Sequence, residues 1–137
     1  MASMERGGLV YVCDDTEQIR RLIRVNLELE GYEVREAGDG EELVAALHEL
    51  DPLPGVVTLD AQMSPRDGWW TIAQIRADPR LAHIPVIMVT ASVQQHDRVQ
   101  AEGSGLDAFV SKPFDPEHLI ELVSGFMAEG RAHSPSP

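Results

Sequence analysis

Five short apolar runs alternate along the chain with segments in which apolar residues recur every three or four positions. Short apolar runs that end in polar residues are typical of buried β-strands, and they cover residues 9–13, 56–59, 85–89 and 108–111, while residues 32–37 alternate between apolar and polar as a more exposed second strand. Helical spacing follows each run, in residues 19–30, 39–50, 69–77, 92–102 and 115–127. Strands that alternate with helices predict an α/β domain, in which helices cover both faces of one parallel sheet.

The length of the chain favours a single domain. Its 137 residues are 43% hydrophobic, which is enough for one substantial core. We expect a flexible lead over residues 1–8, one domain over residues 9–129, and a disordered tail rich in serine and proline over residues 130–137. The sequence has no apolar run long enough to span a membrane and no signal-peptide pattern at its start, so we expect a cytoplasmic protein without membrane insertion.

The charge of the chain is strongly acidic. It has 23 Asp and Glu against 11 Lys and Arg, and a formal net charge of −12. This charge repels nucleic-acid phosphates, so we expect no direct nucleic-acid binding by this chain. The single cysteine, Cys13, excludes an internal disulfide and a zinc site built from cysteines.

Reactive side chains follow four of the five predicted strands. Asp14 and Asp15 follow the first strand, Asp60 follows the third, Thr90 ends the fourth, and Lys112, the only lysine, follows the fifth. Because ligands of parallel sheets bind beyond the carboxyl ends of the strands, we expect these side chains to converge on one edge. Three carboxylates suit a hard cation such as Mg²⁺, which completes its coordination with water and phosphate oxygens.

A carboxylate at such a site can also act as a nucleophile toward a phosphoryl group and form an aspartyl phosphate. Phosphoryl transfer depends mainly on positioning and on the neutralisation of charge. A metal ion, a lysine and a hydroxyl directed at the same oxygens supply both. The residues alone therefore predict a metal-assisted phosphoryl site built on an aspartate.

From residue 9 to residue 127 the chain resembles the receiver domain of two-component response regulators. The motifs that carry the resemblance occur in order after successive strands: Val12-Cys13-Asp14-Asp15, Leu59-Asp60-Ala61-Gln62-Met63, Asp67-Gly68, Val89-Thr90-Ala91 and Phe109-Val110-Ser111-Lys112-Pro113-Phe114. The resemblance implies a doubly wound, flavodoxin-like fold of three layers, with five helices and five parallel strands in the order 2-1-3-4-5.

The resemblance also implies the roles of the acids. Asp60 is expected to accept a phosphoryl group from a sensor histidine kinase or a histidine phosphotransfer protein. Asp15, Asp60 and the backbone carbonyl of Gln62 are expected to hold Mg²⁺, with Mn²⁺ able to substitute, while Asp14 acts through water. Lys112 is expected to pair with a phosphoryl oxygen and to have a cis peptide bond to the following proline.

Thr90 and Phe109 are the switch residues that the resemblance implies. The Thr90 hydroxyl would turn toward the new phosphate and Phe109 would swing inward with it. The surface over residues 93–127 would then change its binding of a downstream protein target or of a second copy of the chain. The sequence departs from the family in two places: Pro65 lies one position later than the usual proline, after Ser64, and Phe109 lacks the hydroxyl of the common tyrosine.

Three other functions compete with this prediction. A phosphohydrolase with an aspartyl nucleophile needs an Asp-x-Asp arrangement after the first strand, which Asp14-Asp15-Thr16 does not have. A receiver-like scaffold that is never phosphorylated would not need the complete set of acids. A nucleotide or flavin binder is disfavoured because no glycine-rich phosphate loop follows the first strand. We therefore predict a phosphoacceptor signalling domain rather than an enzyme, with slow self-phosphorylation from small donors and slow self-dephosphorylation.

Overall fold

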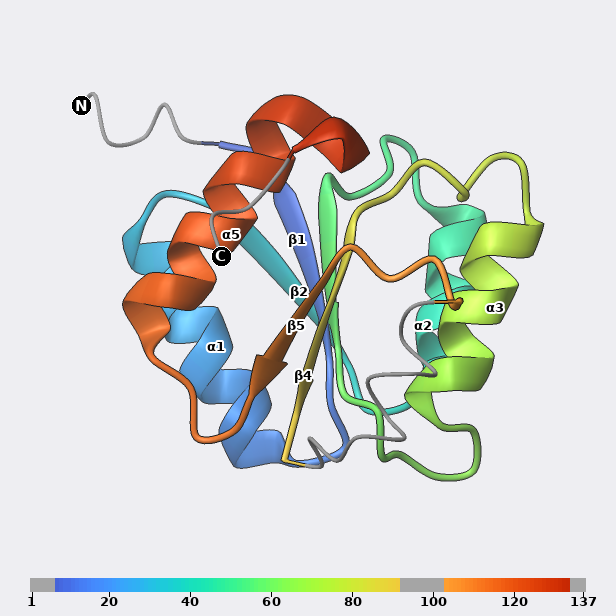
Figure 1. Ribbon diagram of the computed structural model, residues 1–137, viewed down its shortest axis with the longest axis horizontal. Helices are drawn as coiled ribbons and strands as arrows, with labels where there is room; N and C mark the ends of the chain where they lie inside the picture. The colour runs from blue at the N-terminus through green and yellow to red at the C-terminus, as the bar shows by residue number, and fades with distance from the viewer. Residues whose placement is uncertain (1–6, 92–102, 134–137) are drawn as a thin grey trace.

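The fold is a five-stranded sheet with helices on both faces (Figure 1). The computed structural model describes residues 7–91 and 103–133. The strands are β1 (Leu9–Cys13), β2 (Glu33–Ala37), β3 (Val56–Leu59), β4 (Val86–Thr90) and β5 (Ala108–Ser111). The helices are α1 (Glu17–Leu29), α2 (Gly40–Glu49), α3 (Gly68–Ala77), α5 (Pro116–Glu129) and the short 3-10 helix η2 (Gly130–Ala132).

The strands lie side by side in the order β2-β1-β3-β4-β5, and each neighbouring pair is parallel. This confirms the predicted flavodoxin-like order. Because all five strands run in the same direction, their carboxyl ends form one edge of the sheet, which lies at the bottom of Figure 1. Helices α1, α2, α3 and α5 each begin near that edge, so helix N-termini and strand ends surround the same region.

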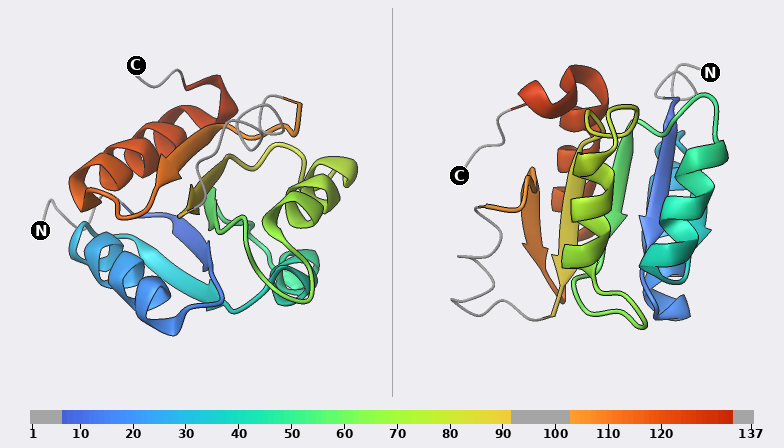
Figure 2. Two further views of the ribbon diagram at one scale, coloured as in Figure 1. Left: turned by 60° about the horizontal axis from the view of Figure 1, so that its bottom comes forward. Right: turned by 90° about the vertical axis from the view of Figure 1, so that its right-hand side faces the viewer.

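Among the described residues, two helices pack on each face of the sheet, which gives the expected three layers. Figure 2 shows α1 and α5 on one side of the sheet and α2 and α3 on the other. The core between the sheet and α1 and α5 includes Ile23, Leu27, Val123 and Phe126. The core on the other face includes Leu43, Leu47, Ile72 and Ile75. Burial of these residues provides the main driving force for folding.

Aspartates begin three of the described helices. Asp39 accepts a hydrogen bond from the Glu42 N–H at 2.9 Å, which forms the predicted cap of α2. Asp67 caps α3 by accepting from the Trp70 N–H, and Asp115 caps α5. These caps determine where the helices start after the strand ends, and so they help to shape the edge of the sheet.

The structure differs from the sequence expectations in its details. The predicted fourth helix, residues 92–102, lies outside the described residues. Tyr32, expected to begin the second strand, instead donates its N–H to the Leu27 carbonyl at the end of α1. Residues 130–132, which were expected to be part of a disordered tail, form η2 instead. Arg131 of this helix donates to Asp107 at 2.9 Å, and this bond holds the segment against the domain.

Candidate phosphoryl-transfer site

The three predicted acids meet at the carboxyl-end edge of the sheet. Asp14 and Asp15 follow β1, and Asp60 follows β3, which is paired with β1. One carboxylate oxygen of each acid lies within 4.8 Å of the other two. Asp14 and Asp60 are only 1% and 6% exposed, whereas Asp15 is exposed. The cluster therefore has two buried members and one member in contact with solvent.

Lys112 brings a positive charge to the two buried acids. Its Nζ lies 2.8 Å from Oδ2 of Asp14 and 3.4 Å from Oδ2 of Asp60. Lys112 follows β5, its backbone N–H donates to the Thr90 carbonyl at 2.8 Å, and its peptide bond to Pro113 is cis, as the sequence resemblance implied. The ammonium offsets part of the repulsion between two carboxylates that have little access to water.

Backbone groups bond both the main chain and the side chain of Asp60. Its N–H donates to the Cys13 carbonyl at 3.0 Å, and its Oδ1 accepts the Gln62 N–H at 3.1 Å. Burial raises the pKa of the Asp60 carboxyl above its ordinary value and the Asp14 carboxylate adds to this effect, while the Gln62 N–H and Lys112 oppose it. Asp60 is therefore a poorly hydrated carboxyl group whose ionised form is stabilised by nearby donors and by Lys112.

The start of α3 packs closely against the Asp60 peptide. The Gly68 N–H donates to the Ala61 carbonyl at 2.9 Å, and a Cβ at position 68 would collide with the Asp60 carbonyl oxygen. Glycine is therefore required at this position for steric reasons. The Asp67-Gly68 motif thus has a structural role, in which Asp67 caps α3 and Gly68 allows it to approach the site.

The other residues singled out by the sequence lie on or next to strands β3, β4 and β5. Thr90 is fully buried at the end of β4, in register with Ser111 of β5. Phe109 is partly buried and packs against the core on the α2 and α3 face. Gln62 is exposed. The switching roles of Thr90 and Phe109, and the metal-binding role of the Gln62 carbonyl, stay predictions.

The donor set of the cluster fits a hard divalent cation. It consists of carboxylate oxygens, which Mg²⁺ prefers, and its exposed member gives water access to one side. A cation there would reduce the repulsion among three acids that share a single nearby ammonium within the described residues.

One residue in contact with the site was missed by sequence reasoning. Arg20 of α1 donates from Nη1 to the Asp14 carbonyl at 2.8 Å and from Nε to Glu36 of β2 at 3.0 Å. Its position within an amphipathic helix gave it the appearance of an ordinary surface arginine. The role of Arg20 depends on a tertiary contact with Glu36 of β2, and the periodicity of the α1 sequence does not reveal such a contact.

Comparison with known sequences identifies the family. The sequence profile of the response regulator receiver domain matches residues 10–124. The DNA-binding dual master transcriptional regulator RpaA of Synechocystis is 36% identical over 118 residues, which cover 86% of this chain and 48% of that protein. The response regulator PleD of Caulobacter vibrioides is 37% identical over 114 residues, 83% of this chain and 25% of that protein. This chain spans about half the length of the first curated relatives that it matches.

Solved structures agree with the sequence match. The receiver domain of the Francisella response regulator 1452 has a TM-score of 0.81 at 25% identity, over 89% of this chain and 98% of that chain. The chemotaxis protein CheY4 of Vibrio cholerae has a TM-score of 0.78 at 26% identity, over 85% of this chain and 95% of that chain. In the part of the chain that the structure describes, no helix is both long and apolar enough to cross a membrane. The chain belongs to the response regulator receiver domain family.

Proposed function

We propose that this domain is a phosphorylation-controlled switch in which Asp60 accepts a phosphoryl group from a phosphohistidine. The donor would be a sensor histidine kinase or a histidine phosphotransfer protein. One observation carries the proposal: a largely buried aspartate lies among two further acids and within 3.4 Å of the Lys112 ammonium. Such a site combines a nucleophile with the cationic groups that phosphoryl transfer requires.

The proposed transfer is a nucleophilic displacement at phosphorus. A carboxylate oxygen of Asp60 forms the new P–O bond while the P–N bond of the phosphohistidine breaks. The imidazole leaves with the bonding electron pair and takes up a proton, and Asp60 becomes an acyl phosphate. Lys112 can pair with the transferred phosphoryl oxygens, because its ammonium already lies beside the Asp60 carboxylate.

We propose that Asp15, Asp60 and the Gln62 carbonyl hold Mg²⁺, with Mn²⁺ able to substitute, and that Asp14 acts through a water molecule. The hydrogen bonds that the two Asp14 carboxylate oxygens accept, at 2.9 Å and 2.8 Å, are shorter than those that the two Asp60 oxygens accept, at 3.1 Å and 3.4 Å, which favours the indirect role for Asp14. The bound cation would supply charge neutralisation at the phosphoryl oxygens.

Phosphorylation would reach the surface through Thr90 and Phe109. Thr90 ends β4 next to β5, and its carbonyl accepts the N–H of Lys112, so a change at Lys112 is mechanically linked to both strands. The proposed output surface comprises residues 93–127, which include β5 and most of α5. Its occupant would be a downstream protein target or a second copy of this chain, with no direct nucleic-acid contact by the domain itself.

The proposed activity is signalling in the cytoplasm, without repeated turnover of a substrate. Slow self-phosphorylation from small phosphodonors and slow loss of the phosphoryl group would accompany it. RpaA is described as DNA-binding, and this chain matches only 48% of that protein. The output of a full-length protein that contains this domain is therefore a separate proposal from phosphorylation at Asp60.

Intact-protein mass spectrometry tests the proposed site. The protein would be incubated with Mg²⁺ and acetyl phosphate, alongside Asp60→Asn and the control Asp78→Asn, which changes an acid at the C-terminal end of α3. We expect one phosphoryl adduct on the unmodified chain and on Asp78→Asn, and none on Asp60→Asn. Donor consumption without an adduct would indicate a hydrolase, and the absence of an adduct despite Mg²⁺ binding would indicate a scaffold.

A further inference from the structure

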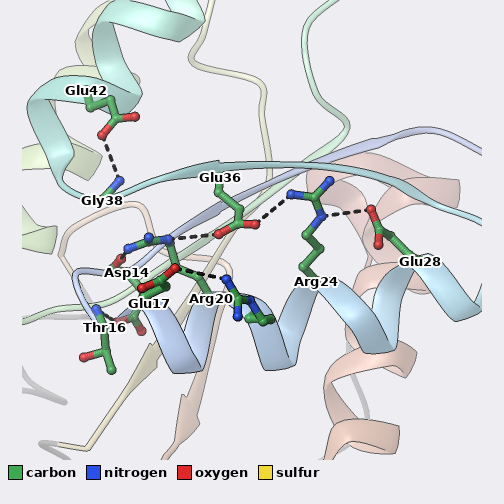
Figure 3. Close-up of polar contacts among 10 residues, drawn as sticks. Asp14, Thr16, Glu17, Arg20, Arg24, Glu28, Glu36, Gly38 and Glu42 are labelled. Carbon is green, nitrogen blue, oxygen red and sulfur yellow. Dashed lines mark hydrogen bonds and ion pairs between the residues drawn. The ribbon is translucent and has the colours of Figure 1, made fainter.

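Arg20 connects three elements at the edge of the acid cluster. In Figure 3 its side chain extends from α1 and lies between Asp14 and Glu36. Its Nη1 donates to the Asp14 backbone carbonyl at 2.8 Å, and its Nε donates to Glu36 Oε1 at 3.0 Å. The Arg20 and Glu36 side chains are only 19% and 23% exposed, so this ion pair is better shielded from solvent than an ordinary surface pair.

The bond from Arg20 adds to three other hydrogen bonds that hold Asp14 in position. The Asp14 N–H donates to the Ala37 carbonyl of β2 at 3.2 Å, and Oδ1 of Asp14 accepts the Thr16 N–H at 2.9 Å. Lys112 occupies Oδ2, and Arg20 occupies the main-chain carbonyl. That carbonyl belongs to the peptide group that joins Asp14 to the next residue. Its orientation therefore constrains, together with the φ angle of the next residue, the direction in which the following side chain leaves the backbone.

The following residue is Asp15, the exposed acid of the cluster. Burial does not restrict its carboxylate as it restricts those of Asp14 and Asp60. Within the described residues, its Oδ1 accepts only a long hydrogen bond from the Thr16 hydroxyl, at 3.5 Å, so the peptide that precedes Asp15, which Arg20 holds from α1, contributes to its position. Groups behind metal ligands that fix ligand direction in this way contribute strongly to metal affinity.

We propose that Arg20 is a positioning residue for the divalent cation, and that it acts by fixing the Asp14–Asp15 peptide. Glu36 orients the guanidinium from the neighbouring strand, so that one nitrogen reaches the carbonyl. This inference rests on the proposed function, because it requires that the acid cluster binds Mg²⁺. It adds a residue that supports the metal ligands without being one.

Arg24 provides a matched control one helical turn further along α1. It also binds Glu36, at 2.8 Å, and it pairs with Glu28 at 2.9 Å (Figure 3). The hydrogen bonds given by Arg24 within the described residues go to these two glutamates and not to the Asp14 carbonyl. Arg20→Gln and Arg24→Gln therefore remove the same charge and a bond to the same glutamate, but only Arg20→Gln removes the bond to the site.

The test measures Mg²⁺ affinity by calorimetry and the rate of phosphorylation by acetyl phosphate across a Mg²⁺ series. We expect Arg20→Gln to weaken Mg²⁺ binding about tenfold, the lower end of the range for groups that support metal ligands. The phosphorylation rate at saturating Mg²⁺ should return to within about twofold of the unmodified rate, because Arg20 does not contact the reacting atoms. Arg24→Gln should change the Mg²⁺ affinity less than about twofold.

Arg20→Lys separates geometry from charge. Lysine keeps the positive charge but lacks the planar fork that bonds the carbonyl and Glu36 together, so we expect it to restore the Mg²⁺ affinity only in part. Urea unfolding identifies folded variants, and Arg20→Lys replaces Arg20→Gln in the comparison if the latter fails to fold.

The outcomes distinguish this inference from the proposed function. If the unmodified chain does not bind Mg²⁺, the metal site is wrong and the role of Arg20 is overturned with it. If the unmodified chain binds Mg²⁺ and Arg20→Gln binds it equally well, only the role of Arg20 is overturned. Equal weakening by Arg20→Gln and Arg24→Gln, or full restoration by Arg20→Lys, would show that the guanidinium bond to the Asp14 carbonyl is not the source of the effect and would also overturn it.

Discussion

Lys112 forms a closer ion pair with Asp14 than with the proposed phosphoacceptor. Its ammonium lies 2.8 Å from Asp14 and 3.4 Å from Asp60. Both acids are largely buried, so each depends on this cation for part of its stabilisation. A phosphoryl group on Asp60 would compete with Asp14 for the same ammonium, which links the chemistry at β3 to the ends of β1 and β5.

Lys112→Gln should lower the free energy of unfolding at pH 7 by about 3 kcal/mol, because it leaves two buried carboxylates without their cation. Mg²⁺ should then stabilise this variant more than it stabilises the unmodified protein, since the metal would replace the missing charge. Urea unfolding with and without Mg²⁺ measures both effects. A smaller Mg²⁺ effect in Lys112→Gln than in the unmodified protein would contradict the proposed metal site beside Lys112.

Glu36 should make stability depend on acid pH. Hydrogen bonds from Arg24 and Arg20 hold the pKa of the Glu36 carboxyl below its ordinary value, although partial burial opposes them. A carboxyl with a lowered pKa stabilises the folded state above its unfolded pKa of about 4.3 and loses this contribution as the pH falls further. Glu36→Gln should therefore cost about 0.5–1 kcal/mol at pH 7.

The difference between Glu36→Gln and the unmodified chain should shrink as the pH falls below about 4. Urea unfolding at a series of pH values provides the measurement. A difference that stays constant or grows toward acid pH would show that the ionised carboxylate is not the source of the stabilisation.

Thr58 of β3 has a buried hydroxyl without a hydrogen-bond partner among the described residues. Thr58→Val should raise the free energy of unfolding by about 1 kcal/mol, because it removes an unsatisfied polar group and keeps the branched shape. Thr71→Val is the matched control, since the buried Thr71 hydroxyl donates to the Asp67 carbonyl at 2.9 Å. We expect this second change to be destabilising. Thermal unfolding gives the melting temperature of each variant. A shift of both melting temperatures in the same direction would refute the explanation.

Asp107 lies just before β5, at the amino ends of the strands, and we expect its ion pairs to stabilise the fold. Its carboxylate accepts from Arg76 at 2.8 Å, from Arg131 at 2.9 Å and from the Val86 N–H at 2.9 Å. Asp107→Ala should cost about 3 kcal/mol because it leaves the shielded Arg76 without its counter-ion. Arg131→Ala should cost about 0–1 kcal/mol, since that side chain is 37% exposed. Equal costs in chemical denaturation would contradict this ranking.

Much of the fold was predictable from local pattern. The runs that became β1, β3 and β4 are buried along nearly their whole length, so they are continuous apolar stretches that end abruptly in polar residues. The strand pattern and the rule for ligand sites of parallel sheets predicted that the acids would converge on one edge. The family resemblance implied that the first and third strands are neighbours, and this adjacency brings Asp14 and Asp60 close together.

Contacts between distant segments were not predictable in this way. Arg20 reaches Glu36 across 16 positions, and Arg131 reaches Asp107 across 24. Long arginine side chains on helices give no periodic signal of their partners. The predicted tail illustrates the same limit, because its composition indicated disorder while η2 packs back through Arg131.

The most direct test of Asp60 locates the phosphoryl group on the chain. Borohydride reduces an aspartyl phosphate to homoserine, and tandem mass spectrometry of the resulting peptides identifies the modified position. After treatment with acetyl phosphate and Mg²⁺, we predict homoserine at position 60 alone, and none when Mg²⁺ is removed by a chelator. Reduction at position 14 or 15, or an unmodified position 60 in a chain that carries the adduct, would contradict the assignment of Asp60 as the phosphoacceptor.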